Sequence, residues 1–223
     1  MAHVILTNVR PWGAAPVDIV LSGAEILSVV PAGTAGGEGA RLDGDGLLAL
    51  PGFINAHAHL DKSWWGQPWV SYGGEATTQG RISHERAERD GLGIPSPSST
   101  TAVLREYLRH GTTAVRSHVD VDLGVGLRGI EVVREAVAGF GGAIEVEIVA
   151  FPQDGVMRRP GVLDLLDRAA EAGATPLRST ATRSRSSTDS SASRSGAVSG
   201  STSICTTVVS SAPSRSSSSP SAP

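Results

Sequence analysis

The chain has 223 residues, of which 39% are hydrophobic, and its formal net charge is −3. That length suffices for one large domain or two small ones, and the composition is typical of a soluble protein with a substantial core. The small net charge gives no reason to expect a polyanionic partner, and no run approaches the roughly 20 apolar residues of a membrane helix. We therefore expect neither nucleic acid nor a membrane as a partner.

The compartment follows from two further features. Cys205 is the only cysteine, which excludes a disulfide framework and fits a reducing compartment. The run MAHVILTNVRPW lacks the basic region, long apolar core and cleavage site of a secretory signal. A cytoplasmic location is the expectation.

Charge and composition divide the chain into three segments. Residues 1–176 carry 14 basic and 21 acidic side chains, whereas residues 177–223 carry five arginines and one aspartate. Within the first part, residues 1–50 alternate apolar and polar residues between turn signals, as in HVILTNVRP and PVDIVLSGAEILSVVP. This pattern predicts short strands of a small β domain, the N-terminal part of a sandwich.

Residues 51–176 alternate strand-like and helix-like runs. The strand-like LLALPGFINAHAH is followed by two more strands, TTAVRSHVDVD and AIEVEIVAFPQDG, and each is followed by a segment with apolar residues at helical spacing. A charged segment, residues 81–90, lies after the first strand. Repeated strand–helix units predict a parallel sheet with helices outside it, either doubly wound or part of a (β/α)8 barrel.

Residues 177–223 form a low-complexity, Ser/Arg-rich tail. They include no aromatic residue, lysine, glutamate or histidine. Such a composition cannot bury enough apolar surface to offset the conformational entropy of the chain. We expect this tail to be disordered.

The stretch FINAHAHLDK places His57 and His59 at the end of a predicted strand. Side chains at i and i+2 of a strand share a face, so the two imidazoles project together. Sites of parallel β/α proteins form at the carboxyl ends of the strands, and imidazoles bind Zn, Fe and similar divalent metals. For the bare triplet, a chance pair of hydrogen-bonded or solvated rings is the alternative.

The residues around this pair resemble a known family. LPGFINAHAHLDK resembles the first barrel strand of the amidohydrolase superfamily, in which an apolar run, Pro-Gly and a spacer lead into His-x-His. SHVDVD and EIVAFPQDG look like the ends of the next two strands in the cytosine deaminase branch. The resemblance covers roughly residues 3–176. It implies an α/β fold, the N-terminal part of a (β/α)8 metal-dependent hydrolase barrel, preceded by a small β domain and followed by the disordered tail.

The resemblance implies roles for five residues. His57 and His59 would be the first-strand ligands of one divalent metal ion, Zn or Fe. Gln153 matches the glutamine whose amide reads the pyrimidine ring, with a solvated loop glutamine as the alternative. His118 would line the substrate pocket, or be a packed strand histidine. Asp61 would orient the first loop by hydrogen bonding to groups behind the metal ligands, or be a simple turn carboxylate.

The implied activity is hydrolytic deamination of a pyrimidine or related cyclic amidine or amide by a metal-activated water, in the EC 3.5.4 class. The partner would be a small nitrogen heterocycle, and homo-oligomerisation of the intact enzyme is left open. The family also uses a histidine and a glutamate at the fifth strand, a histidine at the sixth and an aspartate at the eighth. Residues 177–223 hold no histidine or glutamate. No catalytic residue is therefore identified, and the chain as written is expected to be inactive.

A shift of reading frame near residue 176 is our interpretation of the tail. Codons for STSICTTVVSSAPSRSSSS can be chosen so that an offset of two nucleotides permits DLHLHDGGELGAFEIELI, which contains a His-x-His and a glutamate like the missing fifth strand. One alternative is a truncated, inactive half-barrel with an exposed sheet edge. The other is an Arg-Ser tail that binds RNA, which the presence of only five arginines disfavours.

Overall fold

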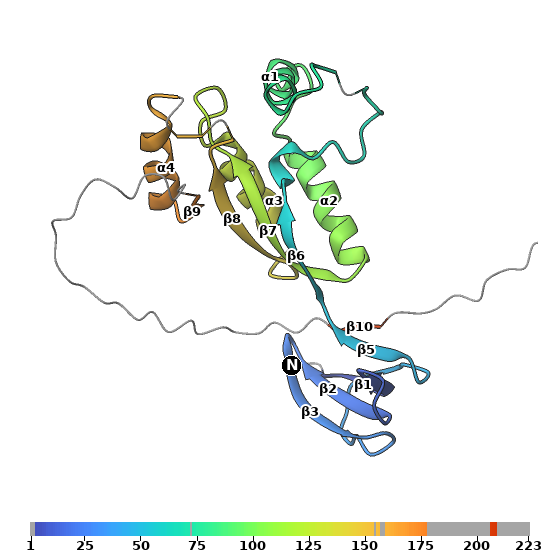
Figure 1. Cartoon of the computed structure of the whole chain (residues 1–223). Helices are drawn as coiled ribbons and strands as arrows, with labels where there is room; N and C mark the ends of the chain where they lie inside the picture. Colours follow the sequence, from blue (N-terminus) through green and yellow to red (C-terminus); the bar gives the residue numbers. More distant parts are fainter. Residues whose placement is uncertain (1–2, 72, 154, 157–158, 178–205, 209–223) are drawn as a thin grey trace, which may run out of the picture. The chain divides into compact units, whose positions relative to one another are not determined.

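The computed structural model describes residues 3–71, 73–153, 155–156, 159–177 and 206–208. These residues form two compact units (Figure 1). The first unit contains residues 3–52 together with 206–208, and the second contains residues 53–177.

The first unit is a six-stranded sheet with the hydrogen-bonded order β10-β5-β1-β2-β3, in which β4 also pairs with β1. Its small core contains Leu6, Val9, Ile19 and Ala49. The register of β1 against β2 shifts between Leu6 and Val9, so that these two residues, three positions apart, both reach this core. Strands β1 to β4 lie within residues 1–50, which the sequence assigned to strands, β5 extends one residue beyond them, and β10 comes from a distant part of the chain. Their bounds are β1 (His3–Pro11), β2 (Val17–Ser22), β3 (Glu25–Pro31), β4 (Ala40–Asp43), β5 (Leu48–Pro51) and β10 (Thr206–Val208).

Strand β10 differs from the disorder that we predicted for residues 177–223. It pairs antiparallel with β5, and Thr207 lies opposite Leu50. Two physical reasons favour a strand at this position: the run TTV is β-branched throughout, and an edge strand presents unpaired backbone groups. The rest of the prediction falls on residues 178–205 and 209–223, which lie outside the described residues.

The second unit is an α/β arrangement around a parallel sheet with the strand order β6-β7-β8-β9. All three neighbouring pairs are parallel, as the repeated strand–helix units predicted. The pairing of β6 with β7 shifts register twice, which indicates irregular backbone next to the histidine pair. The strands are β6 (Phe53–Ala58), β7 (Thr112–Asp120), β8 (Glu145–Phe151) and β9 (Thr175–Pro176).

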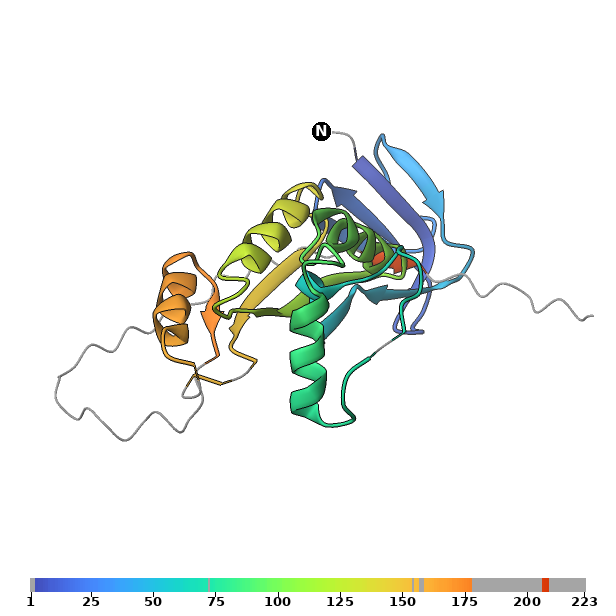
Figure 2. The same cartoon turned by 90° about the horizontal axis from the view of Figure 1, so that it is seen from above.

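One face of this sheet packs against helices. The buried core joins α2, α3 and α4 to the strand residues that alternate toward them, including Val115, Val119 and Ala150. Strand residues of the opposite face carry charge, and Arg116 pairs with Glu147 there at 2.7 Å. Figure 2 shows the sheet and these helices from above. The helices are α1 (Thr78–Glu88), α2 (Pro97–Arg109), α3 (Arg128–Ala138) and α4 (Val162–Glu171).

Local signals explain where α2 begins and ends. The side chain of Ser96 accepts a hydrogen bond from the Ser99 amide at 3.3 Å, and Pro97 occupies the first turn. Gly111, with φ of 81°, ends the helix because glycine adopts the left-handed region without steric cost. In contrast, α1 buries none of its residues, so apolar periodicity could not reveal it as a helix.

Strand β9 has only two residues, opposite Val149 and Ala150 of β8. The exposed sheet edge that we expected after the third strand is therefore covered over these two positions. None of the described helices combines the length and apolarity needed to cross a membrane.

Candidate functional site

Three histidine rings meet at the carboxyl edge of the parallel sheet. The ring centroids of His57 and His118 lie 4.2 Å apart, and the ring of His59 lies 5.3 Å from that of His57 and 6.0 Å from that of His118. The first two rings in sequence come from the end of β6, and His118 comes from β7. The i and i+2 spacing thus brings the predicted pair together, and the neighbouring strand adds a third imidazole.

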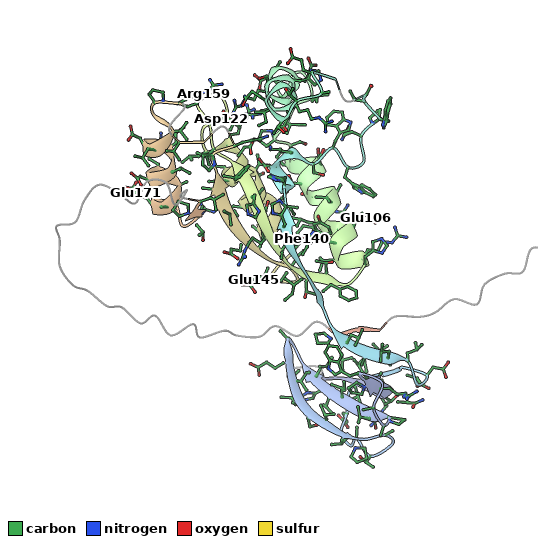
Figure 3. All side chains as sticks on the ribbon, viewed as in Figure 1. Glu106, Asp122, Phe140, Glu145, Arg159 and Glu171 are labelled. Atoms are coloured by element: carbon green, nitrogen blue, oxygen red, sulfur yellow. The ribbon has the colours of Figure 1, made fainter. Side chains whose placement is uncertain are left out.

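Figure 3 shows the direction of the sheet through two labelled ends. Asp122, which follows β7, and Arg159 lie at one end of the second unit, whereas Glu145, the first residue of β8, lies at the other. Because β6, β7 and β8 are parallel, their carboxyl ends share the end marked by Asp122. Parallel β/α proteins form their binding sites at this edge.

The environment favours the neutral form of His59 and His118. Burial, followed by the positive charge of Lys62, lowers the pKa of His59 to about 4. Burial and the neighbouring His57 also lower the pKa of His118. An imidazole must be neutral to donate a lone pair to a metal, so both rings are in the protonation state that a ligand requires at neutral pH.

The histidines meet part of the requirement for a metal. The Nδ1 atoms of His59 and His118 are buried and have no hydrogen-bond partner among the described residues, so a bound group could satisfy them. However, no group of three His, Cys, Asp or Glu side chains in the described ranges is close enough to hold an ion. Among the described residues, therefore, the unpartnered Nδ1 atoms of His59 and His118 leave room for a bound group at this edge, but no complete set of three metal ligands is present.

The turn that follows the histidine pair is held by buried hydrogen bonds. The Leu60 amide donates to Ser117 Oγ at 3.0 Å, and Thr100 Oγ1 donates to the Leu60 carbonyl at 3.1 Å. Asp61, only 4% exposed, accepts a hydrogen bond from the Asp120 amide at 2.9 Å. These contacts tie the end of β6 to β7 and α2. We call this set of bonds the turn clamp.

The Asp61 carboxylate accepts this bond from the Asp120 amide on Oδ2, and its Oδ1 has no hydrogen-bond partner among the described residues. Burial, followed by the charge of Asp120, raises the pKa of Asp61 to about 7. Burial also raises the pKa of Asp120 to about 6, although the nearby Lys62 opposes this. The first turn of α3 packs closely on this region, because a Cβ at Gly129 would meet Val119 at 2.9 Å and Asp61 at 3.3 Å.

Gln153 lies just past β8 and lines a cavity of about 650 Å³ next to His59. Its Oε1 accepts a hydrogen bond from Lys62 Nζ. The same ammonium lies 2.9 Å from Asp120 Oδ2 and 3.0 Å from Glu85 Oε1. The remaining lining residues of the cavity are Ala76, Thr78, Arg81, Ile82 and Phe151.

Lys62 and Glu85 are functional candidates that the sequence reasoning missed. Lys62 is the only lysine of the chain and follows the histidine motif directly. Its position in HLDK is the one signal that could have drawn attention to it. Glu85 lies on α1 and gives no local signal, because only the fold brings that helix over the strand ends.

A second set of charges surrounds Asp122 at the same edge. Arg89 Nη2 and Arg86 Nε lie 3.0 Å and 3.2 Å from Asp122 Oδ2, and the amides of Gly124 and Val125 donate to Oδ1. Burial opposes ionisation of this carboxyl, but the Arg89 hydrogen bond, the amides and the arginine charge outweigh it and lower its pKa to about 2.

The N-terminal part of the chain is similar to known proteins in sequence and in fold. The chain is 29% identical over 132 residues to the N-isopropylammelide isopropyl amidohydrolase of Pseudomonas sp. (strain ADP). It superposes on the N-isopropylammelide isopropylaminohydrolase of Burkholderia multivorans with a TM-score of 0.71 at 39% identity. The homologues and structural neighbours of this N-terminal part are amidohydrolase-superfamily enzymes. They include the 5-methylcytosine deaminase of Klebsiella pneumoniae, which superposes with a TM-score of 0.53 at 27% identity.

The similarity to these amidohydrolases covers only part of each chain. The Pseudomonas match covers 52% of this chain and 30% of that enzyme. The structural superpositions cover 78% and 77% of this chain, and 44% and 41% of the solved chains. This chain thus spans less than half the length of these amidohydrolases. No protein-family profile matches it.

Proposed function

We propose that this chain carries the first metal-binding and substrate-reading part of an amidohydrolase that deaminates a pyrimidine or a related cyclic amidine or amide. The observation that carries the proposal is the meeting of His57, His59 and Gln153 around one edge of the parallel sheet. The relatives support the substrate class by their names, which include an isopropylammelide hydrolase and a 5-methylcytosine deaminase bound to 5-fluorocytosine.

In this proposal His57 and His59 hold one divalent ion, Zn or Fe, which would supply an activated water near neutral pH. Other features of the site support metal binding and substrate binding. The low pKa of His59 keeps its imidazole neutral, so that one ring nitrogen has a free lone pair. Phe151 packs beside the histidines, with its ring 5.7 Å from that of His59, and limits water on one side. Gln153 binds the substrate ring, and His118 lines the pocket.

The finer fold assignment is also a proposal. Helices cover one face of the parallel sheet, and the described residues of the opposite face carry Arg116, Glu147 and the histidines. A doubly wound sheet has helices on both faces, whereas a barrel has them only outside. This supports a first part of a (β/α)8 barrel over residues 51–176, preceded by a β-sandwich part over residues 1–50.

A second candidate is an inactive fragment. A catalytic metal site usually has three protein ligands and an open position, and no such group lies among the described residues. This supports a chain without catalysis of its own and agrees with a frame shift near residue 176. The cytoplasmic location and the oligomeric state remain predictions.

Metal content tests the proposal. The chain in the restored reading frame is loaded with Zn²⁺, freed of excess metal and analysed by elemental analysis as wild type, His57→Ala, His59→Ala and His110→Ala. His110, exposed at the end of α2, is the matched control. We expect retained metal in the wild type and the control, and its loss in the other two variants. Retention in all four would refute the ligand assignment.

The reaction is tested in the reading frame that restores the missing strand. The restored protein is assayed with cytosine, isocytosine and cyclic ureides. Release of ammonia from cytosine or isocytosine, each of which carries an exocyclic amino group, supports the deaminase assignment, and its absence from a metal-loaded, folded sample would refute it. Ring opening of a cyclic ureide without ammonia would instead indicate a cyclic amidase.

A further inference from the structure

Lys62 makes contacts that fix the direction in which the Gln153 amide points. Its ammonium contacts three oxygen atoms from separate segments: Gln153 Oε1 after β8, Asp120 Oδ2 at the end of β7, and Glu85 Oε1 on α1. An ammonium has three N–H donors and no acceptor. The ammonium therefore donates a hydrogen bond to Gln153 and forms ion pairs with Asp120 and Glu85, and these three contacts restrain the Lys62 side chain, which is 18% exposed.

The chemistry of the two groups decides the orientation of the amide. Lys62 can only donate, so the atom of Gln153 that faces it must be the oxygen. The amide nitrogen, with its two N–H donors, is left for the cavity that Gln153 lines together with His59 and Phe151. A glutamine without Lys62 could turn by 180° and offer either a donor or an acceptor.

We propose that Lys62 is a positioning residue that makes Gln153 a pure donor in the pocket, so that the site selects rings with a carbonyl oxygen at the position read by Gln153. This proposal rests on the proposed function for the identity of the ligand as a ring. It assigns the Gln153 amide only a donor role toward the ligand, although a free amide has a donor and an acceptor. The orientation itself depends only on the contacts of Lys62.

The single lysine makes the orientation directly measurable. In the 223-residue chain, ¹⁵N-lysine labelling gives one side-chain ammonium signal, because Lys62 is the only lysine. We expect this signal to shift in Gln153→Ala and to stay unchanged in Gln67→Ala, a control glutamine in the loop after the histidine motif. The Gln153 side-chain amide signal should shift in turn in Lys62→Met. If neither signal shifts when the other residue is substituted, the proposal is overturned. The deaminase assignment does not depend on this result.

Selectivity is tested with two probes that differ at ring position 2 and, as a consequence, at N1, which carries a proton in cytosine and a lone pair in 4-aminopyrimidine. Cytosine has a ring carbonyl at C2, and 4-aminopyrimidine has a hydrogen there. We expect the wild-type chain to bind cytosine about two- to tenfold more tightly, the range of one neutral hydrogen bond. The ratio of the affinities for cytosine and 4-aminopyrimidine should fall to about one in Gln153→Glu. This variant keeps an oxygen for Lys62 but has no N–H donor.

Lys62→Met should also lower the ratio, because the released amide can turn. That variant leaves Asp120 and Glu85 without their ammonium, so its fold is checked by circular dichroism. If Lys62→Met is unfolded, the selectivity is tested with Gln153→Glu alone. A wild-type ratio of one, or failure of both probes to bind at millimolar concentration, would overturn the selectivity.

Discussion

Replacing Asp122 with asparagine tests the charge network at the carboxyl edge of the sheet. The carboxylate binds Arg89, Arg86 and two backbone amides, and its side chain is only 11% exposed. Asparagine keeps the size and one acceptor oxygen but removes the charge. The substitution therefore isolates the electrostatic contribution from the packing of the loop after β7.

The magnitude follows from the pKa. The folded state lowers the pKa of Asp122 from 3.8 to about 2, and a difference of this size corresponds to roughly 2 kcal/mol of folding free energy. Because the folded pKa is the lower one, this stability is present above pH 3.8. It is lost as the pH falls through the folded value near 2.

Urea unfolding at pH 6 and at pH 2.5 measures this contribution. At pH 6 we expect Asp122→Asn to unfold with about 2 kcal/mol less free energy than the wild type. At pH 2.5 the difference in unfolding free energy between the variant and the wild type should be less than half of its value at pH 6. Asp90→Asn is the matched control, because Asp90 pairs with Arg128 at the surface, where an ion pair contributes little, and its loss of unfolding free energy at pH 6 should be small. A gap for Asp122→Asn that is equal at both pH values would refute the electrostatic reasoning.

Three further predictions concern activity and core packing. In the frame-restored enzyme, Gln153→Ala should lower kcat/KM for cytosine about two- to tenfold with unchanged metal content; unaltered kinetics would contradict its role in reading the ring. The 223-residue chain with added Zn²⁺ should release no ammonia from cytosine above the buffer rate, since the missing groups act as a unit; turnover from a sample of the correct intact mass would contradict this. Leu104→Ala, at a fully buried position, should lower the free energy of urea unfolding by about 2–5 kcal/mol. The half-exposed Leu163→Ala should lower it far less, and equal losses would show that α2 is not packed as described.

The sequence predicted the parts of the site that depend on local spacing. Strand periodicity fixed the shared direction of His57 and His59, and the position of His118 at a strand end placed it beside them. Apolar periodicity likewise located α2, α3 and α4, because each buries a stripe against the sheet. These features need only a few neighbouring residues to specify them.

Features that depend on distant segments were not predictable in this way. α1 has no buried residue, and the contacts of Lys62 with Glu85 and Gln153 join segments that meet only in the folded unit. β10 was missed because the composition around Thr207 indicates disorder, whereas pairing with β5 depends on an edge that no local pattern describes. To predict the contacts of Lys62, one would have had to know the strand order and the path of the loop before α1.

The turn clamp has a consequence for how a metal would bind. Backbone and hydroxyl groups hold Leu60 and Asp61 to β7 and α2 without help from any ion. The end of β6 is thus ordered before binding, and little conformational entropy remains to be lost when a metal arrives. In a zinc finger, by contrast, metal binding is itself the folding reaction. A chelator should therefore strip the ion from this unit and leave a folded apoprotein, which can be loaded with one metal after another for comparison.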